Sequence, residues 1–257
     1  MDQILTFLQE KFLAWTFVLS RVAGLFLATP LYSGWYIPLN VKILLSVFLS
    51  WLVLYTLPNV VVPLDTHPFL IGIGIFNNFT VGVVMGFFAF MFITATMSAG
   101  GIFSIQMGFM VASSFDPSAP DIPLLGNYLY LIAVYIFVAL KGHVLFFNAL
   151  VESFRKFPVT MYGADFNIVK MLIEKSPQLF VIALQLGFAI IAFMLLTTVL
   201  LGIISRLIPQ LNVFMVGLPL KVLVGLIIFL GMIPIWADVL SKITNDVLIW
   251  VKEFVSR

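Results

Sequence analysis

The residue types that carry out most enzyme chemistry are few in this chain. His67 and His143 are the only histidines, neither stands in an HExxH pattern, and neither has a carboxylate three or four residues away. A metal site would need ligands from distant segments, and the absence of cysteine removes thiolate ligands and cysteine nucleophiles. We therefore expect no metal, and we expect His143, which follows Gly142 at a helix start, to serve in backbone hydrogen bonding.

The remaining candidates for catalysis are equally weak. Asp116 and Asp121 are carboxylates five residues apart, but the Asp116-Pro117 step is more typical of a turn or cap than of an acid–base couple. Ser113 and Ser114 lack the Gly-x-Ser-x-Gly frame of an activated serine. No phosphate-cradling loop is present either. The sequence predicts no enzyme and no cofactor, so any energy source must lie on a partner.

Three cations interrupt apolar segments, and each must be accommodated there. Arg21 lies within the first apolar stretch, and Arg206 and Lys221 interrupt the C-terminal apolar region. A cation in hydrocarbon costs about 2.5–3.5 kcal/mol, so each should snorkel, form a pair, or face protein or water. Glu10, or an acid on another chain, is a possible partner of Arg21.

The elements that position these residues must be buried almost throughout. Of 257 residues, 62% are hydrophobic and only 9% are charged, the net charge is +2, and the mean hydropathy is +1.17. A soluble domain carries about 25% charged residues, so a soluble enzyme, a nucleic-acid binder and a disordered tail are excluded. The exterior must be covered by lipid or by other protein chains. Asp2 stands where a cleavable signal carries a basic residue, and Glu10 and Lys11 interrupt the apolar run that follows, so we expect the chain to be inserted whole.

Proline, glycine and charge divide the chain into about six long apolar helices in hairpins and a final amphipathic helix. The final helix suits either interfacial packing or the docking of a partner. We therefore expect an all-α, polytopic membrane protein that forms a single domain over residues 1–257, with an orientation that the loop charges do not determine. The apolar helices are expected at about Leu8–Ala28, Val41–Leu57, Phe69–Met97, Leu124–Leu140, Pro177–Ser205 and Phe214–Ile235, with a short piece at His143–Phe154 and a polar stretch without a motif at Arg155–Lys175.

The segment after the third expected helix, Ser98–Pro123, is the most informative part of the sequence. Gly100, Gly101 and Gly108 loosen its backbone, and three prolines exclude a helix beyond it. It is nevertheless too apolar for an exposed loop, and non-helical backbone at membrane depth is tolerated only where protein buries it or where it lines a cavity. Two interpretations stay open: a deformable Met/Phe-rich seal that closes a pore, or a kinked or re-entrant connection without a gating role.

Within this segment the run Gln106–Pro117, QMGFMVASSFDP, resembles the QMG…DP signature of the flagellar biosynthetic protein FliR family, the R component of the type III export gate. Lys141–Val144 resembles the family's short glycine–histidine motif, and Leu201–Pro219 resembles its long C-terminal signature. Leu218–Lys221 also resembles a leucine–proline–lysine pattern of the P subunit. The residues that these other matches single out as structural are Gly142, His143, Arg206, Pro209, Gln210, Gly217, Pro219 and Lys221.

The resemblance, which covers about Phe12 to Ile235, implies a noncatalytic subunit of the flagellar protein export gate. With FliP-type and FliQ-type subunits it would form a plugged channel that secretes unfolded flagellar proteins across the bacterial inner membrane at the flagellar basal body. FlhB-type and FlhA-type export components would be further partners, and no nucleic acid is implied. The plug of the family falls on Gln106, Met107, Gly108, Phe109, Met110, Phe115, Asp116 and Pro117.

Two other functions stay open at the level of sequence. Virulence injectisomes use a counterpart of the same subunit, and the residues do not distinguish that system from a flagellum. A small-molecule secondary transporter would need paired broken helices in two related halves, and only one such break is evident in the sequence.

Overall fold

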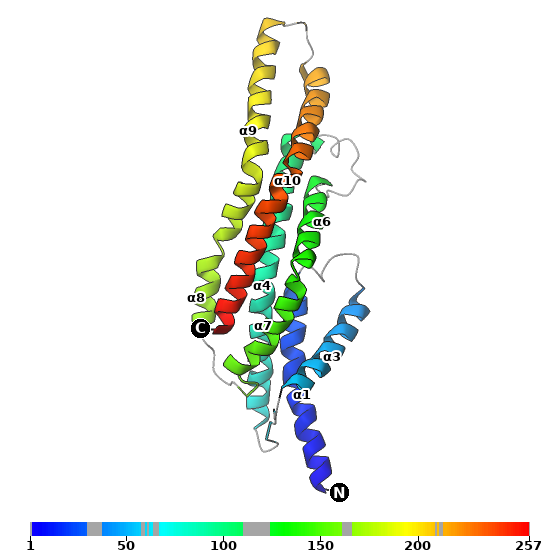
Figure 1. Ribbon diagram of the computed structural model, residues 1–257, viewed down its shortest axis with the longest axis vertical. Coiled ribbons are helices and arrows are strands. Elements are labelled where there is room, and N and C mark those ends of the chain that lie inside the picture. Colours follow the sequence, from blue (N-terminus) through cyan, green and yellow to red (C-terminus); the bar gives the residue numbers. More distant parts are fainter. Residues whose placement is uncertain are drawn as a thin grey trace. The chain divides into compact units, whose positions relative to one another are not determined.

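The computed structural model describes residues 2–29, 38–57, 60, 62–63, 67–109, 124–160, 166–208, 210 and 213–256. Every regular element in these ranges is a helix, and none is a strand (Figure 1). The all-α prediction is therefore confirmed. The helices are α1 (Asp2–Ala28), α3 (Leu39–Thr56), α4 (Pro68–Gln106), α6 (Leu124–Ala139), α7 (Gly142–Lys156), α8 (Phe166–Lys175), α9 (Gln178–Leu207) and α10 (Val213–Ser256).

The helices are long and apolar enough for a membrane protein. Within the described residues five stretches meet the roughly 20-residue requirement for a span, and α6 with α7 adds a sixth if this pair is one broken span. The chain is thus polytopic, as its composition predicts. The five stretches are Gln9–Ala28, Leu39–Thr56, Pro68–Gln106, Lys170–Leu207 and Met215–Val255.

Two predicted helix ends lie inside longer helices. We expected a break at Ser98, but α4 continues through Gly100 and Gly101 to Gln106. The final amphipathic segment is likewise continuous with the apolar helix before it, in α10. The reason is the same in both places: backbone groups at membrane depth must be satisfied internally, which favours an unbroken helix even through residues that break helices in water.

The chain packs as two compact units, and α4 and α10 contribute to both of them. Unit 1 comprises Met1–Met91, Lys141–Ser176 and Asn245–Arg257. Unit 2 comprises Phe92–Leu140 and Pro177–Thr244. Each unit carries one of the two constellations of buried residues described below.

In unit 1, α1 and α4 cross with their backbones in direct contact. A Cβ atom at Gly82 would collide with the carbonyl of Arg21, and one at Gly86 would lie 2.6 Å from the Leu25 carbonyl oxygen. Gly82 and Gly86 form a GxxxG pair, the spacing that allows close packing of membrane helices. α3 joins α1 through a hydrogen bond of 2.9 Å from Trp15 Nε1 to Ser50 Oγ.

Unit 1 also holds the C-terminal end of α10 with two lysines. Lys156 Nζ donates a hydrogen bond of 2.8 Å to the carbonyl of Phe254, and Lys175 Nζ lies 3.7 Å from Glu253 Oε2 and over the ring of Trp250. A cation at this end complements the partial negative charge of the last carbonyls. The lysines therefore tie α7 and α8 to the last turn of α10.

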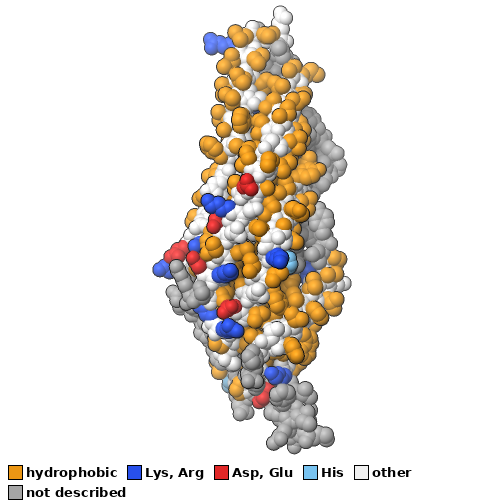
Figure 2. Space-filling view, viewed as in Figure 1, with side chains coloured by type: hydrophobic (Ala, Val, Ile, Leu, Met, Phe, Trp, Pro, Cys, Tyr) orange, Lys and Arg blue, Asp and Glu red, His pale blue; other side chains and the backbone are white. Residues whose placement is uncertain are grey.

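In unit 2, α9 and the N-terminal part of α10 form an antiparallel hairpin (Figure 1). Hydrophobic side chains cover most of the visible face of this hairpin (Figure 2). An apolar surface of this extent requires lipid or another protein chain as its cover. The outward-facing side chains of α9 include Phe180, Leu184, Phe188, Leu195 and Ile203, and those of α10 include Met215, Leu223, Ile227 and Leu230.

Candidate functional site

The QMG motif begins as the C-terminal cap of α4. Gly108 has φ +83°, the left-handed conformation that glycine adopts without a steric cost at the position after a helix end. The amide of Met107 donates to the Phe103 carbonyl at 2.9 Å, and the amide of Gly108 donates to the Ile105 carbonyl at 3.0 Å. The glycine that stops the helix is thus Gly108, and Gly100 and Gly101 lie within it. We call residues Gln106–Phe109 the QMG turn.

Gly100 lies instead where α6 crosses α4. A Cβ atom at Gly100 would lie 2.5 Å from Gly126 Cα, so the two backbones touch at this point. Ser104 Oγ, one turn further along α4, accepts a hydrogen bond of 3.3 Å from the amide of Leu125. The absence of a side chain at Gly100 therefore serves helix packing rather than a hinge.

Met107 anchors the QMG turn on α10. Its side chain is fully buried, and it occupies the space that a side chain at Gly225 would need. A Cβ atom at Gly225 would lie 2.5 Å from Met107 Cγ and 2.8 Å from its sulfur. One residue later, a Cβ atom at Gly108 would lie 3.3 Å from Leu218 Cδ2. The turn is therefore in contact with α10 at two points, about two helical turns apart.

An aromatic stack lies in the same unit and includes a residue of the last turns of α4. Phe103 and Trp236 stack with their ring centroids 5.4 Å apart and an interplanar angle of 8°, and Phe229 meets Trp236 edge-on at 4.9 Å. Trp236 Nε1 donates a hydrogen bond of 3.0 Å to the Leu186 carbonyl of α9. Because Phe103 also accepts the backbone bond from Met107, the stack connects α9 and α10 to the base of the QMG turn.

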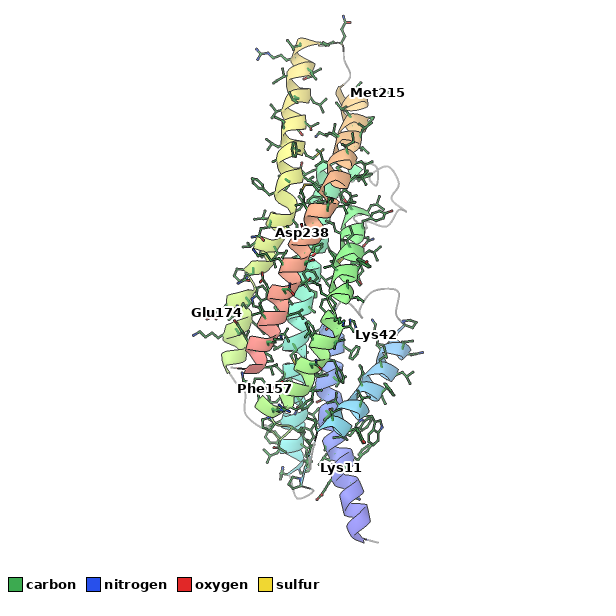
Figure 3. All side chains as sticks on the ribbon, in the orientation of Figure 1. Lys11, Lys42, Phe157, Glu174, Met215 and Asp238 are labelled. Atoms are coloured by element: carbon green, nitrogen blue, oxygen red, sulfur yellow. The ribbon has the colours of Figure 1, made fainter. Side chains whose placement is uncertain are left out.

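An open apolar groove of about 670 Å³ runs along α10 beside the anchor. Leu218, which touches the turn, is one of its lining residues, and Met215 marks its end near the start of α10 (Figure 3). The other lining residues are Pro219, Val222, Leu223 and Leu226. Part of the C-terminal signature, Leu218 and Pro219, thus faces this groove.

The structure brings together part of the predicted site. Gln106, Gly108 and Phe109 are half-buried, and Met107 is fully buried against α10. Met110, Phe115, Asp116 and Pro117 of the predicted plug, and Pro209 of the C-terminal signature, lie outside the described residues. Of the other matched residues, Gly142 and Gly217 are buried, Lys221 is half-buried, and His143, Arg206, Gln210 and Pro219 are exposed.

A second buried constellation lies in unit 1, around Arg21. This side chain is 1% exposed, and its guanidinium donates to Asn78 Oδ1 from Nε and Nη2, at 3.1 and 2.6 Å. It also donates to Ser153 Oγ at 3.0 Å and to the carbonyl of Phe157 at 2.7 Å (Phe157 is labelled in Figure 3). The guanidinium lies over the ring of Phe154, 3.9 Å from its centroid.

Every hydrogen-bond partner of Arg21 in the described chain is neutral. The sequence pointed to Glu10 or to an acid on another chain, and the pairing with Glu10 is wrong. Asn78 completes the network: its Nδ2 donates to the carbonyls of Gly74 and Val159, at 2.8 and 2.9 Å. The network joins α1, α4, α7 and the turn that follows α7, so Arg21 is buried against protein rather than lipid.

The histidines and carboxylates do not converge. His67 is exposed at the start of α4, where its Nδ1 accepts from the amide of Phe69 at 3.3 Å, and His143 is exposed in the first turn of α7. Within the described ranges no group of three or more histidine, aspartate and glutamate side chains could hold a metal ion.

Fold and site together define a polytopic membrane protein in which the QMG turn caps a long apolar helix and packs on the C-terminal helix through Met107. The chain matches the family described as "Bacterial export proteins, family 1" over residues 12–247, and it belongs to this family. The match includes the QMG turn, its anchor on α10 and the Arg21 network.

Individual relatives give the same result along almost the whole chain. The chain is 32% identical to the flagellar biosynthetic protein FliR of Bacillus subtilis over 86% of each protein. It is 28% identical to the protein of that name from Buchnera aphidicola, covering 97% of this chain and 95% of the relative. The FliR protein of Escherichia coli is 25% identical over 96% of each chain.

Gly225, Trp236 and Asn78 are among the residues of these constellations that sequence reasoning missed. The sequence signal for Gly225 was weak, because a single glycine in an apolar helix indicates that another segment packs closely there but does not identify that segment. Asn78 gave a stronger signal, since a polar amide in the middle of an apolar span needs a partner, and Arg21 is a buried cation in another span.

Proposed function

We propose that this chain is a noncatalytic subunit of the flagellar type III protein export gate. The observation that carries the proposal is the family match over residues 12–247, which spans all described constellations. The three relatives named above are flagellar proteins, which favours a flagellum over a virulence injectisome. On this proposal the chain lies in the bacterial inner membrane at the flagellar basal body, as a single gate domain.

FliP-type and FliQ-type subunits are the partners that we propose for the channel itself, with FlhB-type and FlhA-type components as further partners. The exposed apolar face of α9 and α10 supports a shared assembly, because such a surface needs a cover. Unfolded flagellar proteins are the proposed cargo. Energy for transport would come from another component of the apparatus.

We further propose that Gln106–Pro117 is the plug that closes this channel in the resting state. Its methionine and phenylalanine side chains suit a water-excluding constriction that adapts to an irregular partner surface. Its first residues start from a capped helix end, which fixes where the segment leaves α4. The proposed plug residues are Gln106, Met107, Gly108, Phe109, Met110, Phe115, Asp116 and Pro117.

Shortening the plug tests this function directly. A gate whose R subunit lacks residues 110–115 should leak ions, because the apolar seal is shortened. The measurement is the ion conductance of cells, or of the complete gate in a planar bilayer. Phe109→Asp should also raise the leak, and Phe76→Asp, at an exposed position of α4, is the matched control. Wild-type conductance in the shortened gate would refute the plug.

A further inference from the structure

We propose that Gly225 is a positioning residue of the gate, and that it holds Met107 as a fixed anchor which stays in place while the channel opens and closes. The inference rests on the proposed gate function and makes it more specific. It separates Met107 from the other residues of the plug motif. On the sequence alone, Met107 is one more flexible apolar residue of the seal.

Burial is the first reason for treating Met107 as an anchor. Its side chain has no exposed surface, whereas Gln106 before it and Gly108 and Phe109 after it are half-buried. A residue that forms the surface of a constriction must face the path that it closes. Met107 faces α10 instead, where its Cγ, sulfur and methyl group take the place of a side chain at Gly225.

The contact with Met107 occurs at Gly225 and not at Gly231, two glycines of the same helix. Cβ atoms at Gly225 would lie within 2.8 Å of three Met107 atoms, while a Cβ atom at Gly231 would meet nothing within 4 Å. Any larger residue at Gly225 must displace Met107 from a packed site. Gly231 therefore provides a matched control on the same helix.

The surroundings of the anchor are rigid. The amide of Met107 donates a hydrogen bond to the Phe103 carbonyl, and the Phe103 ring stacks on Trp236. The indole N–H of Trp236 in turn donates to the Leu186 carbonyl of α9. Buried aromatic contacts and a satisfied indole N–H resist movement, because breaking them leaves a cavity and an unpaired donor. The turn is thus fixed at its base, and Gly108 sets the direction in which the chain leaves it.

Disulfide cross-linking tests whether the anchor is fixed. One C–C bond of about 1.5 Å separates Cβ and Cγ of Met107, so the Cβ atoms of a Met107→Cys, Gly225→Cys pair lie within about 4 Å, which a disulfide requires. The chain has no native cysteine to interfere. In the complete gate in cells, we expect the disulfide to form on oxidation, and we expect this double-cysteine variant to export at the same rate in its oxidised and its reduced form. A Met107→Cys, Gly231→Cys pair should not cross-link.

Two results of the cross-linking would overturn the proposal. Export that stops on oxidation and returns on reduction would mean that Met107 leaves α10 when the channel opens. Failure of the Met107→Cys, Gly225→Cys pair to form a disulfide, in a gate that still exports, would mean that the anchor contact does not exist.

A double-mutant cycle provides the second, independent test. Gly225→Ala should raise the resting ion leak by about tenfold, because the displaced Met107 shifts the closed state toward open ones. In the Met107→Ala background the same change should have no further effect, because the atoms that collide are gone. Gly231→Ala should leave the leak unchanged. Equal effects of Gly225→Ala in both backgrounds would contradict the anchor.

The two proposals can fail separately. If shortening the plug leaves conductance unchanged, the plug assignment is wrong, but the disulfide still reports whether Met107 is fixed during export. If the shortened plug leaks and the disulfide blocks export, the plug assignment stands and the fixed anchor is wrong.

Discussion

Replacing Arg21 by alanine should destabilise the folded chain by about 3 kcal/mol. The substitution removes four hydrogen bonds of 2.6–3.1 Å and the contact with the Phe154 ring. It leaves Asn78 Oδ1 and the carbonyl of Phe157 without their guanidinium donor, in a site that is closed to water.

The loss of stability on Arg21→Ala is the difference between the lost hydrogen bonds and the recovered cost of burying an ion. Each buried acceptor that loses its partner costs about 1–3 kcal/mol, so the two acceptors together cost about 2–6 kcal/mol. Against this loss, burying an ion costs several kcal/mol, which the unfolded chain does not pay and the alanine variant recovers in part. The hydrogen bonds to a charged donor are worth about 1.5–3 kcal/mol each, so four of them outweigh that cost. The cavity left by the side chain adds to the loss.

The assay is an SDS titration of the full chain in mixed micelles, followed by tryptophan fluorescence. Arg21→Met separates the loss of charge and hydrogen bonds from the cavity, because it keeps most of the side-chain volume and removes only the charge and the donors. We expect it to lose about 2 kcal/mol. The control is Arg155→Ala: this arginine is 80% exposed beside Glu152, and its loss should change stability by less than about 0.5 kcal/mol.

A neutral or stabilising Arg21→Met variant would refute the reasoning. Such a result would mean that removing the buried charge gains more than the four hydrogen bonds contribute. A loss in Arg155→Ala as large as in Arg21→Ala would show that the assay responds to arginine in general rather than to the buried network.

Substitutions at two further positions, one in each unit, test the packing of the units by the same titration. Gly82→Ala should cost about 1–3 kcal/mol, because its Cβ atom would collide with the backbone of α1, whereas Gly72→Ala on the same helix meets nothing within 4 Å and should be harmless. Equal stability of the two variants would contradict the close crossing. Trp236→Phe should cost about 1 kcal/mol for the lost bond to Leu186, and Trp236→Ala about 3–5 kcal/mol for the lost stack as well. An unchanged Trp236→Phe midpoint would mean that the indole bond adds nothing.

Most of the fold could be predicted from the sequence, because membrane helices follow directly from the distribution of apolar residues. The starts of α3, α4 and α9 were predicted to within two residues. The end of α4 was not, because helix propensities measured in water overstate how strongly Gly100 and Gly101 interrupt a helix that is packed on α6.

The candidate site was predicted less completely. The motif identified Gln106–Phe109, but not that Met107 and Phe109 differ in their surroundings. That difference depends on Gly225, which is far away along the chain, and no local pattern links the two residues.

The sequence by itself determined that this chain is a helical membrane protein of an export family, because hydropathy and motif order are properties of the residues alone. Only the tertiary structure decided which neighbours satisfy its buried polar and apolar groups. The partners of Arg21 lie 57, 132 and 136 positions away in the chain, and they are neutral. The physical reason is that a buried guanidinium needs hydrogen-bond acceptors at defined positions around it. Several arrangements of the same helices could supply such acceptors.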